Sequence, residues 1–186
     1  MGYARQRRAD PRIAARVTDA LGDARTVLNV GAGAGSYEPI DRHVLAVEPS
    51  RTMRAQRESQ AAIAIDAIAE DLPLDDASVD ASMAMITIHQ WKNFRKGLGE
   101  LLRVTRESIV VLTFDGPILE RYWLFEYVPE LIAAERSRYV ALDELRQILE
   151  PPGRSAVRTE SSRLFTRDPS DFSMHRSVGP SRAGVS

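Results

Sequence analysis

The chain has 186 residues, of which 25 are basic, 26 are acidic and none is cysteine. A chain of this length suits one domain, and a formal net charge of −1 supplies no overall attraction to nucleic acid or to anionic lipid. The lack of cysteine excludes disulfides, thiolate metal sites and a thiol nucleophile.

The first predicted element is a helix that begins after Asp10. Asp10 can cap this helix, Pro11 suits its first turn, and apolar residues recur at helical spacing as far as Leu21, just before Gly22. Five short segments then predict strands: 26–30, 44–48, 62–66, 79–86 and 108–114. Most of them are apolar on both faces, which is typical of buried parallel strands.

Helical segments separate these strands. Ser50 can cap a helix that contains Met53 and Arg57. Another predicted helix has one apolar face, formed by Phe94, Leu98, Leu101 and Leu102. Strands that alternate with helices imply right-handed crossovers, so we expect an α/β fold with a doubly wound, mostly parallel sheet.

The pattern changes after residue 114. Residues 119–136 are aromatic-rich and helical in character, a helix is predicted over about 142–149, and 156–163 carry a weak strand signal. Residues 167–186 contain five serines and one aromatic residue, too little apolar surface to offset the entropy of ordering. We therefore expect a domain over 1–166, a disordered tail over 167–186, and a sheet without a complete final strand or acceptor cap. Such a sheet would expose an edge, through which copies of the chain could associate as a homo-oligomer.

The most informative segment is the turn after the first predicted strand. Gly31, Gly33 and Gly35 alternate there with small residues, and glycines let backbone N–H groups at a helix N-terminus approach a ligand closely. Glu48 closes the next strand at the same edge of the sheet, where a carboxylate can accept hydrogen bonds from ribose hydroxyls. These features predict a site for an anionic or adenosine-bearing ligand. The alternative is a tight turn beside a solvated acid.

The spacing of the glycines separates two ligand classes. A dinucleotide fingerprint has glycine at its first, third and sixth positions, but here Ser36 holds the sixth position and Gly35 the fifth. This GxGxG pattern, with an acid seventeen positions beyond Gly31, resembles the first two motifs of class I S-adenosylmethionine-dependent methyltransferases. An NAD(P) oxidoreductase is disfavoured further, because the Tyr-x-x-x-Lys pair of short-chain enzymes does not occur.

A second segment extends this resemblance. Residues 69–74 read AEDLPL and are followed by Asp76, Ser78, Val79 and Asp80, which is similar to the AExLPF…SFD segment of the type 11 group of small-molecule methyltransferases. The resemblance implies S-adenosylmethionine as cofactor and a Rossmann-like methyltransferase fold. It also places residues 69 and 70 at the adenine. Solvated loop residues are the alternative for Glu70 and Asp71, and a core position is the alternative for Met53.

The resemblance also covers the N-terminus. Tyr3 and Arg8 match a Tyr…Arg element that in related enzymes reaches the methionine carboxylate of the cofactor, although an exposed basic leader is an alternative. The complete set of expected cofactor-binding residues is Tyr3, Arg8, Gly31, Ala32, Gly33, Gly35, Glu48, Pro49, Met53, Ala69, Glu70 and Met85.

His89 is the candidate for catalysis. It lies in residues 85–91, at the end of the fourth predicted strand, where the family usually reads T-x-H-H-W and Gln90 replaces the second histidine. The resemblance implies that this strand end borders the transferred methyl group, so His89 could orient an acceptor or take its proton. The alternative is a structural contact beside Trp91.

Two functional hypotheses follow. Methyl transfer from a sulfonium to an acceptor depends mainly on proximity, orientation and a dry pocket, so the enzyme itself needs to supply neither a metal nor a nucleophilic side chain. The first hypothesis is an S-adenosylmethionine-dependent methyltransferase with a small-molecule acceptor. Because the resemblance fades after about residue 150, as in a shortened enzyme or an altered reading frame, the alternative is a catalytically impaired cofactor-binding or interaction protein.

The remaining expectations concern partners and location. No apolar run approaches the roughly 18 residues of a membrane span, and the first residues do not resemble a signal region. We therefore expect a cytoplasmic protein that binds neither nucleic acid nor membrane and holds no metal.

Overall fold

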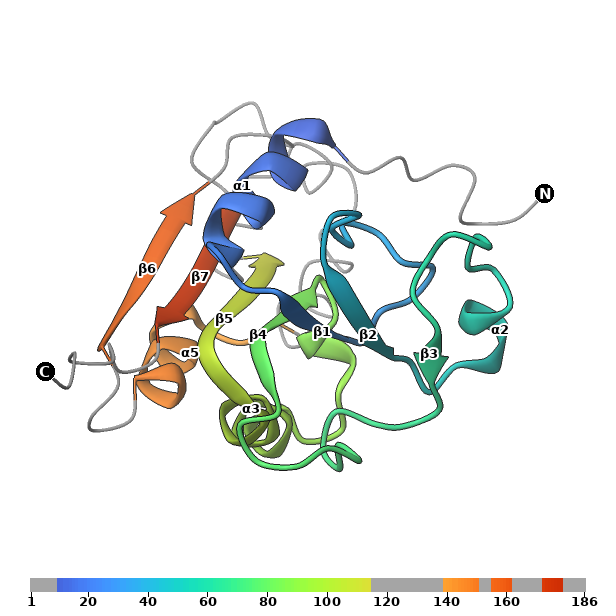
Figure 1. Ribbon diagram of the computed structural model, residues 1–186. Helices are drawn as coiled ribbons and strands as arrows, with labels where there is room; N and C mark the ends of the chain where they lie inside the picture. The colour runs from blue at the N-terminus through green and yellow to red at the C-terminus, as the bar shows by residue number, and fades with distance from the viewer. Residues whose placement is uncertain (1–9, 115–138, 151–154, 162–171, 179–186) are drawn as a thin grey trace, which may run out of the picture.

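The computed structural model describes residues 10–114, 139–150, 155–161 and 172–178, and of the last two segments it describes the backbone. These residues form one sheet with helices on both of its faces (Figure 1). The elements in chain order are α1 (Pro11–Leu21), β1 (Thr26–Val30), β2 (His43–Val47), α2 (Arg51–Arg54), β3 (Ala64–Ile65), β4 (Val79–Met85), the 3-10 turn η2 (Ile88–Gln90), α3 (Phe94–Val104), β5 (Thr105–Phe114), α5 (Leu142–Leu149), β6 (Ser155–Ser161) and β7 (Phe172–Val178).

The sheet has the strand order β3-β2-β1-β4-β5-β7-β6. Strands β1 to β5 pair in parallel, whereas β7 runs antiparallel to both β5 and β6. From β1 the chain builds outward to β3 on one side and returns through β4 to the other side. The α/β doubly wound fold is thus confirmed, and strand order reverses between β1 and β4, where open sheets of this kind bind ligands at the carboxyl ends of their strands.

The helix ends agree closely with the sequence prediction. Asp10 Oδ1 accepts a hydrogen bond from the Arg12 N–H (2.8 Å) at the start of α1, and Gly22 ends this helix with a φ of 58°. Ser50 Oγ accepts one from the Met53 N–H (3.3 Å) at the start of α2. However, α2 ends at Arg54, so Arg57 lies beyond the helix predicted to contain it.

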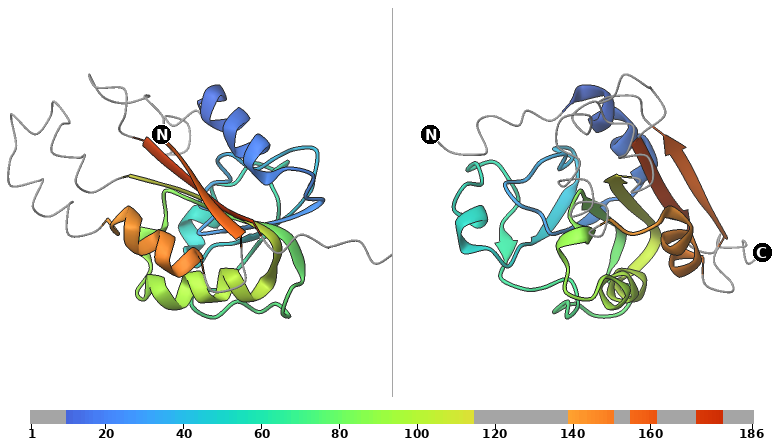
Figure 2. Two further views of the ribbon diagram at one scale, coloured as in Figure 1. Left: turned by 90° about the vertical axis from the view of Figure 1, so that its left-hand side faces the viewer. Right: turned by 180° about the vertical axis from the view of Figure 1, so that it is seen from behind.

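The sheet separates α1 on one face from α3 and α5 on the other (Figure 2), and an apolar layer lies on each side. On one face, α1 packs its buried residues against alternate residues of the central strands: Ile13, Val17 and Leu21 against Val27, Ala81, Met83, Val110 and Leu112. On the other face, α3 and α5 pack theirs against the intervening strand residues: Leu98, Leu101, Val104, Leu145 and Leu149 against Leu28, Val30, Ala84, Ile109 and Val111. Burial on both faces explains why these strands are apolar without polar alternation.

The C-terminal strands correct two expectations. Strand β6 lies where a weak strand was predicted, but β7 falls inside residues 167–186, which were expected to be disordered. Strand β7 pairs with β5 along its whole length, from Phe114↔Phe172 to Ser108↔Val178. The expectations of disorder for residues 172–178 and of an incomplete final strand are therefore wrong, and β5 offers no free edge for association.

The physical reason is that β5 supplies a row of backbone donors and acceptors. A strand added to such an edge gains main-chain hydrogen bonds whatever its side chains are, so composition is a weak guide to it. Strand β3 is shorter than predicted, with two residues instead of five. The helical stretch expected over 119–136, Tyr3 and Arg8 lie outside the described residues.

A polar cluster joins the amino ends of the central strands. Asp80 Oδ2 accepts hydrogen bonds from the backbone N–H groups of Arg25 (3.0 Å) and Thr26 (2.9 Å), and Asp80 Oδ1 accepts one from Arg106 Nη2 (2.5 Å). Burial would raise the pKa of the Asp80 carboxyl, but the hydrogen bonds from Arg106 and Thr26 outweigh it and hold that pKa well below its usual range. This cluster ties β1, β4 and β5 together at the edge opposite the predicted ligand site.

Candidate functional site

The glycine turn after β1 folds back onto the end of β2. The N–H groups of Gly31 and Ala32 both donate to the Val47 carbonyl oxygen, at 2.9 and 3.0 Å. Gly31, Gly33 and Gly35 all have positive φ values, of 68°, 52° and 95°, which favour residues without a Cβ. Residues 31–35 are called the glycine loop below.

Glu48 holds the glycine loop through its side chain. Its Oε2 accepts a hydrogen bond from the Gly33 N–H (2.8 Å), and its Oε1 accepts one from the Ser50 N–H (2.8 Å). Glu48 is 7% exposed, so it is not the solvated acid of the alternative interpretation. A carboxylate has about four acceptor positions, and two hydrogen bonds therefore leave capacity for the hydroxyls of a ligand. The structure brings the predicted loop and the predicted acid together.

The first two glycines of the loop differ in what surrounds them. A Cβ on Gly31 would overlap the side chain of Thr87, 2.8 Å from its Cβ, so packing alone requires glycine there. A Cβ on Gly33 would meet only the flexible end of Met53, 3.4 Å from its Cε, which is ordinary contact. Open space beside Gly33, next to a buried carboxylate, fits an adenosine-bearing cofactor that contacts the backbone.

The other predicted residues of the β2 end lie around this loop. Met53 is half-buried, with its Cε facing the position that a Cβ on Gly33 would take, while Pro49 is exposed between Glu48 and the start of α2. Ala32 is 6% exposed and directs its carbonyl oxygen into the turn, where it accepts a hydrogen bond from the Gly35 N–H (2.9 Å).

The predicted adenine segment lies against the start of α3. Ala69 and Glu70 are buried, with exposed fractions of 5% and 8%, so the solvated alternative does not hold for Glu70. Glu70 Oε1 accepts a hydrogen bond from the Asn93 N–H (2.8 Å), which fixes this segment to the helix N-terminus. Asp71, by contrast, is exposed. A contact between Glu70 and adenine stays a prediction.

Arg103, which had no predicted role, fastens the rest of this segment. Its guanidinium donates to the carbonyl oxygens of Leu72 (3.1 Å) and Leu74 (2.7 Å) and to both carboxylate oxygens of Glu100. Glu100 Oε2 also accepts a hydrogen bond from the Leu72 N–H (2.9 Å), and Arg103 lowers the pKa of the Glu100 carboxyl. The sequence contains one signal for this arrangement, the i,i+3 spacing of an acid and a base on α3.

Backbone strain marks the end of β4. Ile86, a β-branched residue, has a φ of 52°, a left-handed conformation that such residues rarely adopt. Its N–H donates to the Leu112 carbonyl oxygen (2.7 Å), which holds it against β5. Strained backbone persists where the surrounding structure enforces it, and it often lies at functional sites. Met85, a predicted cofactor contact, immediately precedes this turn and is half-buried.

His89 follows in η2 and is half-buried. Its ring lies 4.8 Å from that of Tyr139, centroid to centroid, and Tyr139 in turn meets Phe114 edge-to-face at 5.5 Å. Trp91 turns instead toward α3, where a Cβ on Gly97 would lie 2.6 Å from its ring. The structure thus places His89 against an aromatic pair at the carboxyl end of β5 and leaves its catalytic role a prediction.

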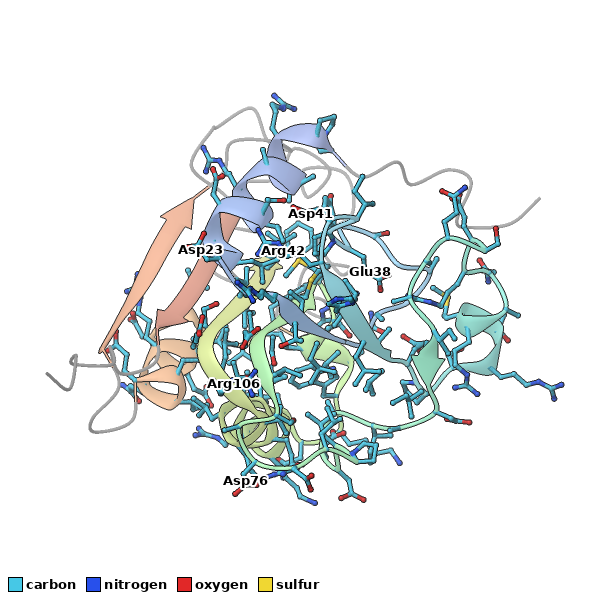
Figure 3. The ribbon with its side chains drawn as sticks, viewed as in Figure 1. Asp23, Glu38, Asp41, Arg42, Asp76 and Arg106 are labelled. Carbon is cyan, nitrogen blue, oxygen red and sulfur yellow. The ribbon has the colours of Figure 1, made fainter. Side chains whose placement is uncertain are left out.

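Arg57 and Glu38 are further residues that sequence reasoning did not assign to the site. Their side chains form an ion pair (2.7 Å) beneath the glycine loop and are 6% and 8% exposed. Figure 3 shows Glu38 beside the central strands. No motif marks these residues, and the sequence alone predicts only ordinary charged positions.

The described residues contain no cluster of histidine and acidic side chains that could hold a metal ion. None of the described helices has the length and apolar character needed to cross a membrane.

A glycine loop at the switch point of a doubly wound sheet, held by an acid at the end of β2, defines the class of nucleotide-binding Rossmann-like enzymes. Residues 28–112 match a family model described as a methyltransferase domain. A protein of Anabaena variabilis assigned to an antibiotic biosynthesis pathway as a methyltransferase is 32% identical, with a TM-score of 0.73 over 87% of this chain and 68% of that one. The chain belongs to the class I S-adenosylmethionine-dependent methyltransferases, and S-adenosylmethionine is its cofactor.

Two more distant structures share the fold. A S-adenosylmethionine-dependent methyltransferase of Thermotoga maritima is 20% identical, with a TM-score of 0.70 over 89% of this chain and 86% of that one. Phosphoethanolamine N-methyltransferase 2 of Haemonchus contortus, in complex with phosphomonomethylethanolamine and S-adenosylhomocysteine, is 13% identical, with a TM-score of 0.69 over 91% of this chain and 52% of that one. No curated protein sequence matches the chain.

Proposed function

We propose that this chain transfers the methyl group of S-adenosylmethionine to a small-molecule acceptor, with the cofactor held across the carboxyl ends of β1 and β2. The observation that carries this proposal is the hydrogen bond from the Gly33 N–H to Glu48 Oε2 (2.8 Å). It joins a loop that can approach a ligand through its backbone to a buried acid that can accept from ribose hydroxyls.

Each part of the cofactor has residues of suitable chemistry. The glycine loop offers backbone that a ligand can approach closely at Gly33, Glu48 offers acceptors for the ribose, and Ala69 with Glu70 provides a buried segment for the adenine. The methionine carboxylate would need a cation. Arg8 is the predicted one, and it precedes Asp10 by two residues.

The start of α1 lies beside the residues that follow the glycine loop. The Asp10 N–H donates to the hydroxyl of Tyr37 (3.4 Å), and Tyr37 lies two residues beyond Gly35. The roles of Tyr3 and Arg8 at the methionine carboxylate stay predictions from the resemblance, beside the alternative of an exposed basic leader.

The cofactor supplies an electrophilic methyl group on a sulfonium. The chain has to orient an acceptor in line with that group and exclude water. We propose that the end of β4, with Met85 and the strained turn at Ile86, forms the floor of the reacting centre, and that His89 orients the acceptor or takes its proton.

A small-molecule acceptor is supported by the setting of the Anabaena variabilis relative, an antibiotic biosynthesis pathway. The alternative, a catalytically impaired cofactor-binding or interaction protein, rested on the shortened C-terminus and the expected loss of the acceptor cap. It is not favoured, because the family model and the similar structures are those of methyltransferases. A cytoplasmic location remains a prediction from the sequence.

The test combines binding with turnover. In a thermal-shift and calorimetric assay, S-adenosylhomocysteine at 100 times its dissociation constant should stabilise the protein by roughly 2.7 kcal/mol, whereas NAD and NADP should not. Gly33→Val should remove that stabilisation. Gly99→Ala, on the exposed side of α3 with no atom within 4 Å of its added Cβ, should retain it.

Transfer of labelled methyl from S-adenosylmethionine to one member of a small-molecule panel would then identify the acceptor class. A folded wild-type protein that binds neither form of the cofactor would overturn the proposal. Undiminished binding to a folded Gly33→Val variant would show that the ligand lies elsewhere.

A further inference from the structure

We propose that Arg57 and Glu38 are positioning residues for the cofactor: their buried ion pair sets the orientation of the glycine loop. This inference rests on the placement of the cofactor at that loop. The pair lies entirely within the described part of the chain, and both side chains are more than nine-tenths buried.

Arg57 donates hydrogen bonds to carbonyl oxygens in the glycine loop and in the segment before β3. Nη1 donates to the Gly33 oxygen at 3.1 Å and lies 3.5 Å from the Ala32 oxygen, while Nε (3.0 Å) and Nη2 (2.8 Å) donate to the Ala62 oxygen. A guanidinium has five N–H donors in a rigid plane, so one side chain can bridge separate segments in this way. Arg57 therefore joins the loop after β1 to the segment that leads into β3.

Glu38 completes the bridge on the other side. Its two carboxylate oxygens accept from Arg57 Nη2 at 2.7 and 2.8 Å. Oε1 also accepts from Asn29 Nδ2 (2.9 Å), in β1, and Oε2 accepts from the Ala62 N–H (3.3 Å). The pair thus connects β1, the glycine loop and the approach to β3 in one hydrogen-bonded unit.

The direction of these bonds decides which loop groups face a ligand. In a trans peptide the C=O and the following N–H point in opposite directions, and the structure contains no cis peptide in the described residues. Since Arg57 holds the Gly33 carbonyl, the N–H of Ala34 points away from the guanidinium. In the preceding peptide, the Gly33 N–H reaches Glu48 on the side opposite Arg57. Arg57 thereby helps to hold the Gly33 N–H toward Glu48 and the Ala34 N–H away from the guanidinium.

Stability alone does not explain an ion pair at this place. Burying two charges is costly, and apolar residues of similar volume often serve as well or better. An apolar pair, however, could not hold the Gly33 carbonyl. The charges also cancel, so the loop carries no net charge toward a cofactor whose sulfonium is positive. Glu38 is therefore expected to neutralise the charge of Arg57, which would otherwise repel the sulfonium of S-adenosylmethionine and weaken its binding.

The experiment uses the full chain with Arg57→Lys, Glu38→Gln and, as a matched control, Arg106→Lys. Arg106 likewise pairs with a carboxylate, that of Asp80, and donates to a carbonyl, that of Ala77 (2.7 Å), but it lies at the amino ends of the strands, away from Glu38 (Figure 3). Calorimetry measures the dissociation constants of S-adenosylmethionine and S-adenosylhomocysteine, and urea unfolding checks the fold of each variant.

Arg57→Lys keeps the charge but loses the bridge, so we expect its affinity for S-adenosylhomocysteine to fall at least about tenfold, whereas Arg106→Lys retains it within twofold. Glu38→Gln leaves the charge of the guanidinium unneutralised. The affinity for S-adenosylmethionine should then fall several-fold more than the affinity for S-adenosylhomocysteine, because only the former carries a positive sulfonium that the guanidinium repels.

Wild-type affinity in a folded Arg57→Lys variant would overturn the inference, and so would an equal loss in Arg106→Lys. Unfolding of both site variants would also overturn it, because the pair would then support the fold and not the loop. These outcomes differ from failure of the proposed function, in which the wild-type chain itself binds neither ligand.

Discussion

Thr87 packs directly against the backbone of Gly31. A Cβ built on Gly31 would lie 2.8 Å from the Cβ of Thr87 and 2.9 Å from its Cγ2. Thr87 is 6% exposed, so it has little room to move away. Through this contact the turn after β4, where the acceptor is proposed to react, rests on the first residue of the cofactor loop.

Gly31→Ala is therefore expected to destabilise the fold strongly. The added methyl would overlap Thr87, and Gly31 has a φ of 68°, so overpacking and backbone strain together predict a loss of about 2–4 kcal/mol in the free energy of unfolding. Gly99→Ala, at an open position in α3, should instead gain about 0.5–1 kcal/mol. Urea unfolding compares the two, and a Gly31→Ala variant as stable as the wild type would contradict the packing described here.

The lowered pKa of the Asp80 carboxyl predicts that the stability of the fold depends on pH. Its pKa in the folded state is held below the usual value, so its ionised form stabilises the fold fully above the unfolded pKa of about 3.9, and this contribution is lost as the pH falls below that value toward the folded pKa. Asp80→Asn should therefore lower stability at pH 6 by about 1–3 kcal/mol and flatten the decline between pH 6 and pH 3.

Unfolding curves at several pH values between 3 and 6 test this prediction. Some decline should remain in the variant, because the pKa of Asp10 is also lowered, to about 2, by its hydrogen bonds with Arg12, and that of Glu100 is lowered by Arg103. If the variant and the wild type lose stability in parallel as the pH falls, Asp80 is not the group responsible.

The parts of this fold that were predictable have strong local signals. The Asp10–Pro11 start and Gly22 end of α1 were correct to the residue, and the two-face apolar runs located β1, β2, β4 and β5 to within a few residues. The position of Glu48 against the loop also followed, because parallel strands end at a common edge. The spacing between the glycines and Glu48 predicted this contact, which the amino-acid composition alone could not do.

The parts that were missed depend on contacts between distant segments. Strand β7 is recruited by the backbone edge of β5, and polar composition concealed it. Arg57 was expected on a helix but turns back to the glycine loop, 24 residues away in sequence from the Gly33 carbonyl that it holds. Glu70 was expected at the adenine, but its hydrogen bond with the Asn93 N–H, 23 residues away in sequence, was not predicted. A single sequence shows which side chains are charged, and the tertiary structure decides which backbone groups they satisfy.

We expect that removal of the Arg103 side chain makes the predicted adenine segment more mobile without unfolding the protein. Arg103→Ala removes the donors to the Leu72 and Leu74 carbonyl oxygens, so amide hydrogen exchange over residues 69–77 should quicken. Affinity for S-adenosylhomocysteine should fall several-fold, because a mobile segment must be ordered on binding. Arg95→Ala is the control, since Arg95 pairs with Glu144 at an exposed position and such surface pairs contribute about 0–1 kcal/mol. Equal exchange in the two variants would show that Arg103 does not fasten the segment.

His89 offers a test that separates chemistry from packing. If its imidazole orients the acceptor or takes its proton, His89→Gln should lower kcat by about 10²-fold or more and leave the dissociation constant of S-adenosylhomocysteine unchanged. Tyr139→Phe preserves the ring that lies 4.8 Å from His89, so it should retain most of the activity. Gln90→His, which restores the T-x-H-H-W pattern, should be at least as active as the wild type. A His89→Gln enzyme with normal turnover but lower thermal stability would assign His89 to the aromatic contact with Tyr139 and leave methyl transfer to proximity and orientation alone.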